Sequence, residues 1–552
     1  MASSRAHLLL ATSLLVACGD DPNSAADTDT DTDSTTGAPT TGMPSTGGPG
    51  SSGTPITTGV DPGTSSTTEA VDESSSSTGG PTDAPPEVTL LVAGETDPDA
   101  LEGADRVPLL AEATDDSAVD RVEFYRDGEL IATDDEAPYE TEVLLTSLDN
   151  ATIQFSATAY DDADQTDESA VSLEVDVIGA NIVHVATDVL EAGGLAYAPG
   201  GGVAVAEDGS IFVTTSTMDQ ETSAFGLRAA RVTADLSEVE WNVRVPAEAL
   251  ADGEQIMGTG EPVLLESAGR LFMTGTTFTP TAEFFETTVV SVPLDGLPPT
   301  VPYEEVGTDA NSFNIPGLVR GPDNDLILHG PGDTLSRISG GGALWQVPTV
   351  AFTVSDLGAT HMSSDDDGNV LLDALNCSAD PCSWNIRKIL AEDGSEAWQQ
   401  TVPADVDTSD FHVGASTTAP NGDAILAFGL APDVSGDIRI IRWDAGGNPV
   451  ESFDLDSGDT SLTVSDIEVD PQGQLVLLGS RFSETDIDAN LIRMAPDGTQ
   501  LWSRSFGFGT ERDLSLAFTF DDRGRVVVAG LADPQSGFLV FAASLWLAVV
   551  DL

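Results

Sequence analysis

The chain has 552 residues, of which 40% are hydrophobic, so it is long enough for several domains with substantial cores. Its formal net charge is −73 at pH 7, and every long segment shares the acidic sign. Such a charge repels nucleic acid and anionic lipid, which argues against nucleic acid as a partner. We interpret the charge as an adaptation for solubility or salt rather than for recognition of a cationic partner.

The first 17 residues have the form of an export signal. Arg5 precedes an apolar run from Leu8 to Val16 that is too short to span a membrane as a helix. The run ends in Leu-Val-Ala-Cys at positions 15 to 18, which resembles the lipobox of bacterial lipoproteins. The resemblance implies cleavage before Cys18, lipidation of its thiol, and a lipid anchor in the outer membrane or at the cell surface. An ordinary secretory signal with an incidental cysteine is the alternative.

Two further cysteines lie five positions apart in the segment Asn-Cys-Ser-Ala-Asp-Pro-Cys. In an oxidising exported compartment we expect Cys377 and Cys382 to form a disulfide that closes this loop. A zinc pair is the weaker alternative, because the sequence offers no second pair or nearby histidine to complete four ligands.

Residues 18–86 are rich in Thr, Ser, Gly, Pro and Asp, and almost free of large apolar side chains. Such a segment cannot bury enough surface to offset chain entropy, so we predict a disordered tether. The alternation of Asp and Thr in Asp27–Asp33 lacks the glycine and glutamate spacing of a calcium-binding loop. The expected role of the tether is to hold the folded domains away from the membrane.

Residues 87–178 are predicted to form a small β-sandwich. The alternating pattern gives seven strands, at 87–93, 106–113, 119–125, 129–133, 139–145, 151–160 and 169–177. Asp127-Gly128 predicts a two-residue hairpin between two of them. The run Val119–Gly128, followed by Pro138-Tyr139, resembles the V-x-x-V-E-F-Y-x-D-G and P-Y segments of bacterial Ig-like domains. The resemblance implies an immunoglobulin-like sandwich without a core disulfide.

A loop of the sandwich carries Asp161, Asp162 and Asp164. Clustered carboxylates of this kind could hold a calcium ion. Polar residues that stabilise a turn are the interpretation we favour.

From residue 180 to 552 a unit of four short strands recurs seven times, with a period of about 52 residues that is typical of propellers. The units align at a turn residue in each: Gly209, Gly269, Asn324, Gly368, Gly422, Gly473 and Gly524. Tryptophans recur in the fourth strands at Trp241, Trp345, Trp398 and Trp502, and we predict that they act as wedges between blades.

The last unit lacks a fourth strand, and we expect Asn181–Ala186 to supply it and close the ring. The repeats resemble propeller lipoproteins of Gram-negative bacteria, and more distantly quinoprotein-like propellers. The predicted fold class is therefore all-β: a seven-bladed β-propeller preceded by an immunoglobulin-like β-sandwich and a disordered tether.

No nucleophile elbow, metalloprotease motif or phosphate-binding loop occurs in the sequence. His184, His329, His361 and His412 lie in different units, so a composite site on the axis stays open, but we favour scattered surface or core histidines. The segment Ser364–Gly368 partly resembles the Asp-box of sialidase propellers, which is a turn rather than an active site. We predict no catalytic residue, no metal ligand and no cofactor.

The expected function is a cell-envelope lipoprotein that presents its propeller to bind a protein or a glycan, without catalysis. Variable loops such as Asp219–Phe225, Thr279–Phe285 and Asn376–Trp384 would supply the binding surface. Two alternatives stay open: an extracellular hydrolase or lyase with a site on the propeller axis, and a purely architectural scaffold. A deep axial cavity with convergent His and Glu side chains would favour the enzyme.

Overall fold

The computed structural model describes the chain from residue 84, with gaps between strands. The described ranges are 84–186, 195–219, 225–245, 255–257, 260–278, 286–306, 317–330, 334–339, 342–348, 360–376, 383–403, 414–429, 438–455, 461–482, 487–507, 513–532 and 544–552. Cys18, Cys377, Cys382, His412, nearly all of the predicted tether and the interiors of the three predicted binding loops lie outside them. Within the described part, no helix is long and apolar enough to cross a membrane.

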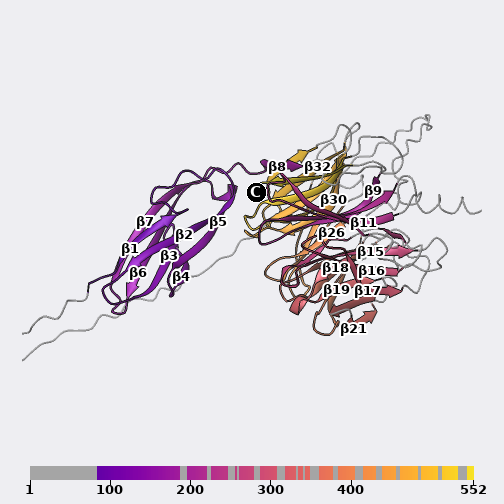
Figure 1. Ribbon diagram of the computed structural model, residues 1–552, viewed down its shortest axis with the longest axis horizontal. Coiled ribbons are helices and arrows are strands. Elements are labelled where there is room, and N and C mark those ends of the chain that lie inside the picture. The colour runs from indigo at the N-terminus through magenta and orange to yellow at the C-terminus, as the bar shows by residue number, and fades with distance from the viewer. Residues whose placement is uncertain are drawn as a thin grey trace, which may run out of the picture. The chain divides into compact units, whose positions relative to one another are not determined.

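The first folded part is a two-sheet sandwich (Figure 1). Its strands are β1 (Glu87–Val92), β2 (Asp105–Thr114), β3 (Val119–Arg126), β4 (Glu129–Asp134), β5 (Tyr139–Leu145), β6 (Thr152–Asp161) and β7 (Thr166–Glu174). One sheet has the order β1-β2-β5 and the other β4-β3-β6-β7. The seven predicted strands are confirmed, with ends displaced by at most three residues. Inward-facing Leu90, Leu109, Phe124 and Phe155 are fully buried between the sheets.

The second part consists of seven antiparallel sheets, numbered here in chain order. Sheet 1 contains β9 (Leu195–Val205), β10 (Ile211–Asp219), β11 (Phe225–Val232) and β12 (Val239–Arg244). Sheet 2 contains β13 (Gln255–Met257), β14 (Val263–Leu265), β15 (Arg270–Phe278), β16 (Glu286–Pro293) and β17 (Thr300–Val306). Sheet 3 contains β18 (Gly317–Arg320), β19 (Leu326–Gly330), β20 (Thr334–Ser339) and β21 (Gly342–Pro348). Sheet 4 contains β22 (Thr360–Ser364), β23 (Val370–Asn376), β24 (Ser383–Ile389) and β25 (Glu396–Pro403).

The remaining three sheets follow the same plan. Sheet 5 contains β26 (Gly414–Thr418), β27 (Ala424–Gly429), β28 (Ile438–Trp443) and β29 (Pro449–Leu455). Sheet 6 contains β30 (Ser461–Val469), β31 (Leu475–Phe482), β32 (Ile487–Met494) and β33 (Gln500–Phe506). Sheet 7 contains β34 (Asp513–Phe520), β35 (Val526–Ala532) and β36 (Ser544–Val550), together with β8 (Ile182–Ala186) from the start of this part.

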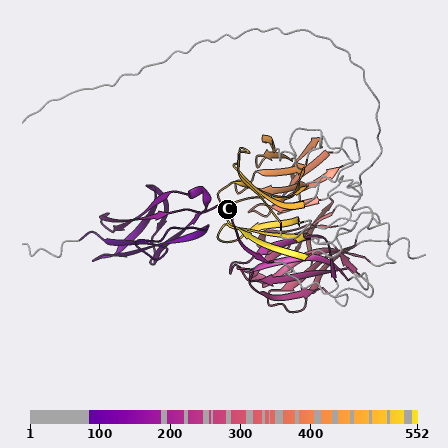
Figure 2. The ribbon, with the colours of Figure 1, turned by 90° about the horizontal axis from the view of Figure 1, so that it is seen from above.

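The sheets follow one another around a common centre, as in a β-propeller (Figures 1 and 2). Their first strands contact one another in the cycle β9, β14, β18, β22, β26, β30, β34 and back to β9. Seven hydrophobic clusters fill the spaces between neighbouring sheets, including the space between sheet 7 and sheet 1. Burial of apolar side chains on both faces of each sheet therefore stabilises the packing of that sheet against its two neighbours.

The predicted pairing of Asn181–Ala186 with the last unit is confirmed. Strand β8 pairs antiparallel with β36, with Val185 opposite Ala548 and His184 opposite Val549. Figure 1 shows the magenta β8 beside the yellow strands of the C-terminal sheet. The backbone N–H of Asp551 also donates to the carbonyl of Asn181 at 2.9 Å. The pairing covers an edge of sheet 7 that would otherwise stay open.

The turn after each first strand explains the repeating glycines. All seven aligned residues have a left-handed backbone, with φ values of 78° at Gly209, 64° at Gly269, 61° at Asn324, 75° at Gly368, 84° at Gly422, 78° at Gly473 and 70° at Gly524. Glycine adopts this conformation without steric cost, and asparagine adopts it more readily than most other residues. The repeat in the sequence is therefore a repeat of turn geometry.

All four recurrent tryptophans lie between sheets as predicted, three of them through a hydrogen bond of the indole to the next sheet. The Nε1 of Trp241 donates to Leu294 in sheet 2 at 2.9 Å, that of Trp345 to Ala391 in sheet 4, and that of Trp398 to Ala445 in sheet 5. Trp502 packs in the hydrophobic cluster shared by sheets 6 and 7. Each indole thus joins the last strand of one sheet to its neighbour.

Candidate ligand site on the first strands

A cavity of about 390 Å³ lies at the centre of the array, between the first strands of sheets 2 to 6. Its polar lining includes Glu261, Arg320, His361, Ser416, Asp466 and Glu468. The volume falls in the range of about 300–1,000 Å³ that is usual for small-molecule sites. Each strand contributes only a few of the lining residues, so the cavity exists only when the sheets assemble.

Glu261, His361 and Asp466 form the central cluster of this cavity. They come from sheets 2, 4 and 6, and one potential ligand atom of each lies within 4.8 Å of those of the other two. The predicted preference for scattered histidines is wrong for His361, which the fold brings beside two carboxylates. His329 is a buried core residue and His184 is half-buried on β8.

Strand alternation on β22 directs His361 toward the cavity. Its neighbour Met362 packs in the hydrophobic cluster between sheets 3 and 4. Successive side chains of a strand point to opposite faces, so His361 faces the other way, into the cavity. Asp373 on β23 lies directly opposite His361 in the antiparallel pairing.

The two ring nitrogens of His361 have different partners. Nε2 lies 3.4 Å from Oε1 of Glu261, while Nδ1 accepts the backbone N–H of Ser416 at 3.3 Å and lies 4.0 Å from Oδ2 of Asp373. Burial disfavours the imidazolium form. The hydrogen bond and charge of Glu261, together with the neighbouring aspartate charges, outweigh burial and raise the pKa of His361 to about 10. In the protonated ring, Nδ1 carries a hydrogen and no longer accepts the N–H of Ser416, and the carboxylate of Asp373 lies 4.0 Å from it.

A β-bulge positions Asp466. The register of β30 against β31 shifts between Val464 and Asp466, and bulges of this kind redirect neighbouring side chains. The two carboxylate oxygens accept the backbone N–H of Ile467 at 2.7 Å and that of Phe518 in sheet 7 at 3.1 Å. Burial, followed by the charge of Glu261, raises the pKa of Asp466 to about 7.

Two more carboxylates adjoin the central cluster. Asp373 is fully buried, and no hydrogen bond of good geometry ends on either of its oxygens among the described residues. Burial raises its pKa to about 6, against the opposing charge of His361. Desolvation, with the charges of Asp466 and Glu261, raises the pKa of Glu468 well above its usual value. The cavity therefore gathers four carboxylates around one imidazole.

This arrangement can accept hydrogen bonds, bind a cation or exchange a proton with a bound molecule. Perturbed pKa values of several adjoining groups are typical of functional sites. The buried ion pairs of the same sheets use Arg or Lys to neutralise Asp, as in Asp470–Arg493. The central cluster has no such Arg or Lys partner among the described residues.

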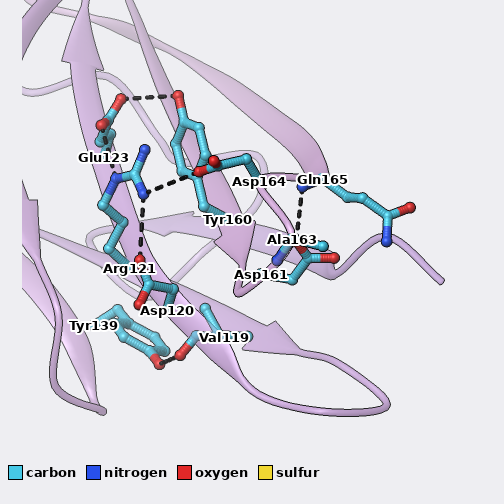
Figure 3. Close-up of polar contacts among 10 residues, drawn as sticks. All are labelled: Val119, Asp120, Arg121, Glu123, Tyr139, Tyr160, Asp161, Ala163, Asp164 and Gln165. Atoms are coloured by element: carbon cyan, nitrogen blue, oxygen red, sulfur yellow. Dashed lines mark hydrogen bonds and ion pairs between the residues drawn. The ribbon is translucent and has the colours of Figure 1, made fainter. Parts of the chain in front are cut away.

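The aspartates of the sandwich loop have a structural role instead (Figure 3). Oδ1 of Asp161 accepts the backbone N–H groups of Ala163 at 2.9 Å and Gln165 at 2.7 Å, which fixes the turn. Asp164 lies 3.8 Å from Arg121, whose guanidinium covers the ring of Tyr160. Asp161 is thus a turn residue, as the favoured interpretation predicted.

The Asp-box-like segment is also a turn. Asp365 Oδ1 accepts the backbone N–H of Asn369 at 2.8 Å, and the N–H of Gly368 donates to the carbonyl of Asp365. The segment lies at the end of β22, and its geometry repeats in the other sheets. Its aspartates and glycine contribute to the frame, and only Ser364 borders the cavity.

Comparison with known proteins supports the prediction that the first domain is immunoglobulin-like. Residues 95–157 match the family model of the bacterial Ig domain. No curated protein matches the sequence. Among solved structures, the fibronectin(III)-like modules of Clostridium thermocellum CbhA are 32% identical over 16% of this chain and 98% of theirs, with a TM-score of 0.15.

Two further solved structures also show similarity. The β-propeller domain of the Trilobed protease from Pyrococcus furiosus is 10% identical over 63% of this chain and 94% of that chain, with a TM-score of 0.38. The phage phi92 endosialidase is 10% identical over 69% of this chain and 71% of its own, with a TM-score of 0.39. Similarity at this level carries no information about function.

Proposed function

We propose that residues 180–552 form a closed seven-bladed β-propeller and that its central cavity binds a small polar ligand. The cycle of contacts among first strands, the pairing of β8 with β36 and the hydrophobic cluster between sheets 7 and 1 support closure. In a closed ring, residues from units 2, 4 and 6, which are far apart in the sequence, meet at the centre.

The observation that carries the proposal is the convergence of Glu261, His361 and Asp466 on the cavity. The carboxylates of Glu261, Asp466 and Glu468 and the hydroxyl of Ser416 accept hydrogen bonds from hydroxyl and amino groups, and the protonated ring of His361 is a donor. A sugar at the end of a glycan presents such groups in a volume that suits the cavity. We therefore infer a glycan-binding role rather than binding through the loops alone.

The envelope location is part of the same proposal. The lipobox-like ending at Cys18 supports a lipid anchor, and residues 18–86 have the composition of a flexible spacer. Replacing Cys18 with alanine should release the exported protein from the membrane fraction. Unchanged membrane partition would contradict the anchor.

A glycan array probed with the labelled full chain tests the binding role. We expect retention of one or a few glycans, and loss of that retention in Glu468→Gln, whose side chain lines the cavity. Glu392→Gln, on an exposed turn of sheet 4, should bind like the parent. Retention of no glycan, or equal retention by the cavity variant, would contradict the proposal.

A hydrolase or lyase is the second candidate, and one observation favours it. His361 lies 3.4 Å from Glu261 on one side and faces Asp373 on the other, which is an arrangement that can deliver or accept a proton. Mass spectrometry of the retained glycans distinguishes the two functions. Shortened glycans indicate an enzyme, and intact glycans indicate a binding protein.

A further inference from the structure

We propose that the central cluster of Glu261, His361 and Asp466 binds one divalent transition-metal ion, for which Zn²⁺ is the best fit. The ion would sit in the cavity that the proposed function assigns to the ligand, so this inference rests on that function and adds a second component to the site. Four features of the described residues carry it.

The first feature is the spacing of the donor atoms. Oε1 of Glu261 and Nε2 of His361 are 3.4 Å apart. Two ligands at about 2.1 Å from a tetrahedral zinc ion are about 3.4 Å from each other. The third donor, on Asp466, lies within 4.8 Å of both, so small shifts of the other donors bring all three to one ion.

The second feature is the support behind the carboxylate of Asp466. Backbone N–H groups of Ile467 and Phe518 hold the carboxylate of Asp466, and each of its oxygens keeps a further lone pair. Residues that hold a ligand in this way set its orientation for a metal. Glu261 is the more exposed donor, with 41% of its side chain accessible to solvent.

The third feature is the buried carboxylate of Asp373. With Nε2 of His361 on a metal, the ring proton resides on Nδ1, which then no longer accepts the backbone N–H of Ser416. Asp373 is the carboxylate nearest to this Nδ1–H, at 4.0 Å. A histidine ligand usually donates its other N–H to a carboxylate or a carbonyl oxygen. Asp373 has no good hydrogen bond of its own in the described structure, so the proposed contact gives this buried group a partner. Asp373 is thus a positioning residue.

The fourth feature is the charge balance. Glu261, Asp373, Asp466 and Glu468 surround a single imidazole, and Arg320, which also borders the cavity, donates to Asn324 at 2.8 Å. Buried carboxylates are stable when they are paired with a cation or coordinate a metal. A divalent ion supplies a positive charge among the four carboxylates, where the structure places no Arg or Lys of the described residues.

The donor set also selects the kind of ion. Imidazole suits zinc and other transition metals, whereas calcium and magnesium prefer oxygen ligands alone. Three protein donors beside an open cavity leave a coordination position free for water or a ligand, as in catalytic zinc sites. Hydroxyl groups of a glycan could occupy that position.

Isothermal titration of the untagged full chain with ZnCl₂ tests the inference. Millimolar Ca²⁺ and Mg²⁺ are added so that the many exposed carboxylates of this acidic chain do not compete. We expect one saturable site that is lost in Glu261→Gln and in His361→Asn, and weakened about 10–100-fold in Asp373→Asn. Loading with Co²⁺ should give a visible absorption band that disappears in the His361→Asn variant.

Matched substitutions away from the cavity serve as controls. Glu392→Gln and His184→Asn should bind Zn²⁺ like the parent, and circular dichroism verifies that every variant is folded. Zn²⁺ binding that is absent, or that persists unchanged in Glu261→Gln, would overturn the inference. A chain that retains glycans but binds no Zn²⁺ contradicts the metal site alone. A chain that binds Zn²⁺ but retains no glycan contradicts the proposed ligand and supports the metal.

Discussion

Nζ of Lys388 lies 2.9 Å from Oδ2 of Asp365, and the two side chains are only 9% and 10% exposed. Lys388 is the only lysine in the chain. Asp365 begins the first turn of sheet 4, and Lys388 lies on the third strand, where its Nζ also donates to the carbonyl of Gly422 in sheet 5 at 3.3 Å. One ion pair therefore ties a turn, a strand and the next sheet together.

The same relationship recurs around the array. A carboxylate of the first turn pairs with a basic residue of the same sheet in Asp208–Arg231, Asp325–Arg337, Asp423–Arg442, Asp470–Arg493 and Asp521–Arg525. The chain has only 20 basic residues, and six of the seven sheets use one in this way. In five of the six pairs the carboxylate is at most 10% exposed, and only Asp208 is open to water. Most of these basic residues therefore neutralise a carboxylate with restricted access to water.

Replacing Lys388 with methionine should lower the free energy of unfolding by about 3 kcal/mol, because the buried carboxylate of Asp365 keeps its hydrogen bonds from Asn369 but loses the cation that neutralises it. Chemical denaturation with urea measures the change. Arg439→Met is the control, since Arg439 pairs with Asp454 at 2.8 Å but both side chains are more exposed. We expect a loss below about 1 kcal/mol there. Equal losses in the two variants would contradict the structural role of the buried pair.

Gly447→Ala should destabilise the protein more than Gly473→Ala. Both glycines have left-handed backbones, with φ of 80° and 78°, which costs alanine about 1–2 kcal/mol. A Cβ at Gly447 would also lie 2.7 Å from the indole of Trp398, whereas nothing lies within 4 Å at Gly473. The additional loss from overpacking should be about 1–3 kcal/mol, measured by urea denaturation. Equal losses would show that Trp398 does not pack as described.

Deleting residues 181–186 should destabilise the sheet array by about 3–5 kcal/mol, because it removes the hydrogen bonds of β8 and exposes the edge of β36. Scanning calorimetry measures the change. Deletion of an equal length from the predicted tether, at 60–65, is the control and should leave the melting temperature unchanged. A β8 deletion that melts like the parent would contradict closure.

His329 should make stability depend on pH between about 6.5 and 4. The ring is fully buried without a hydrogen bond to either nitrogen in the described structure, and burial lowers its pKa to about 4. Below pH 6.5 His329 binds a proton in the unfolded chain but stays neutral in the folded chain. The free energy of unfolding therefore falls by up to about 1.4 kcal/mol per pH unit. Above that pH the contribution is constant.

The variant His329→Leu removes this effect. Its free energy of unfolding, measured by urea denaturation at several pH values, should fall less steeply than that of the parent between pH 6.5 and 4. Carboxylates titrate in the same range in both proteins, so the difference between the two curves isolates His329. Parallel curves would contradict the burial of an uncharged ring.

Much of the fold could be predicted from the sequence because local chemistry determines it. The left-handed turn at Gly473 and its relatives repeats in every unit, and the alternating pattern of the sandwich identifies all seven strands. The fourth strand missing after Val550 indicated that an N-terminal strand completes the last sheet, as β8 does. Turns and strand patterns are properties of short segments, which a sequence displays directly.

The central cluster was missed because its members are far apart in the sequence. Glu261, His361 and Asp466 come from alternate sheets, and acidic residues are so abundant that no single one stands out. A signal was nevertheless present. His361 and Asp466 each lie seven positions before the aligned turn glycine, and Glu261 lies eight before. The corresponding places in sheets 3, 5 and 7 hold the small residues Gly317, Ala415 and Ala517.

The buried ion pairs were missed for another reason. The sequence showed one lysine and few arginines, but strand pairing decides that Lys388 reaches Asp365, 23 positions earlier. Alignment of the third strands with the first turns would have suggested it, because an acidic residue at the turn and a basic residue on the strand recur together. Long-range pairing of side chains requires the register, which short patterns do not supply.

An anomalous-difference map at the zinc absorption edge, from crystals of the full chain soaked in Zn²⁺, tests the central claim most directly. The site exists only if sheets 2, 4 and 6 bring their first strands to one centre, so the map tests the fold and the site together. We predict a strong peak within bonding distance of Glu261, His361 and Asp466. The absence of a peak there, at a Zn²⁺ concentration above that used in the solution titration, would contradict it.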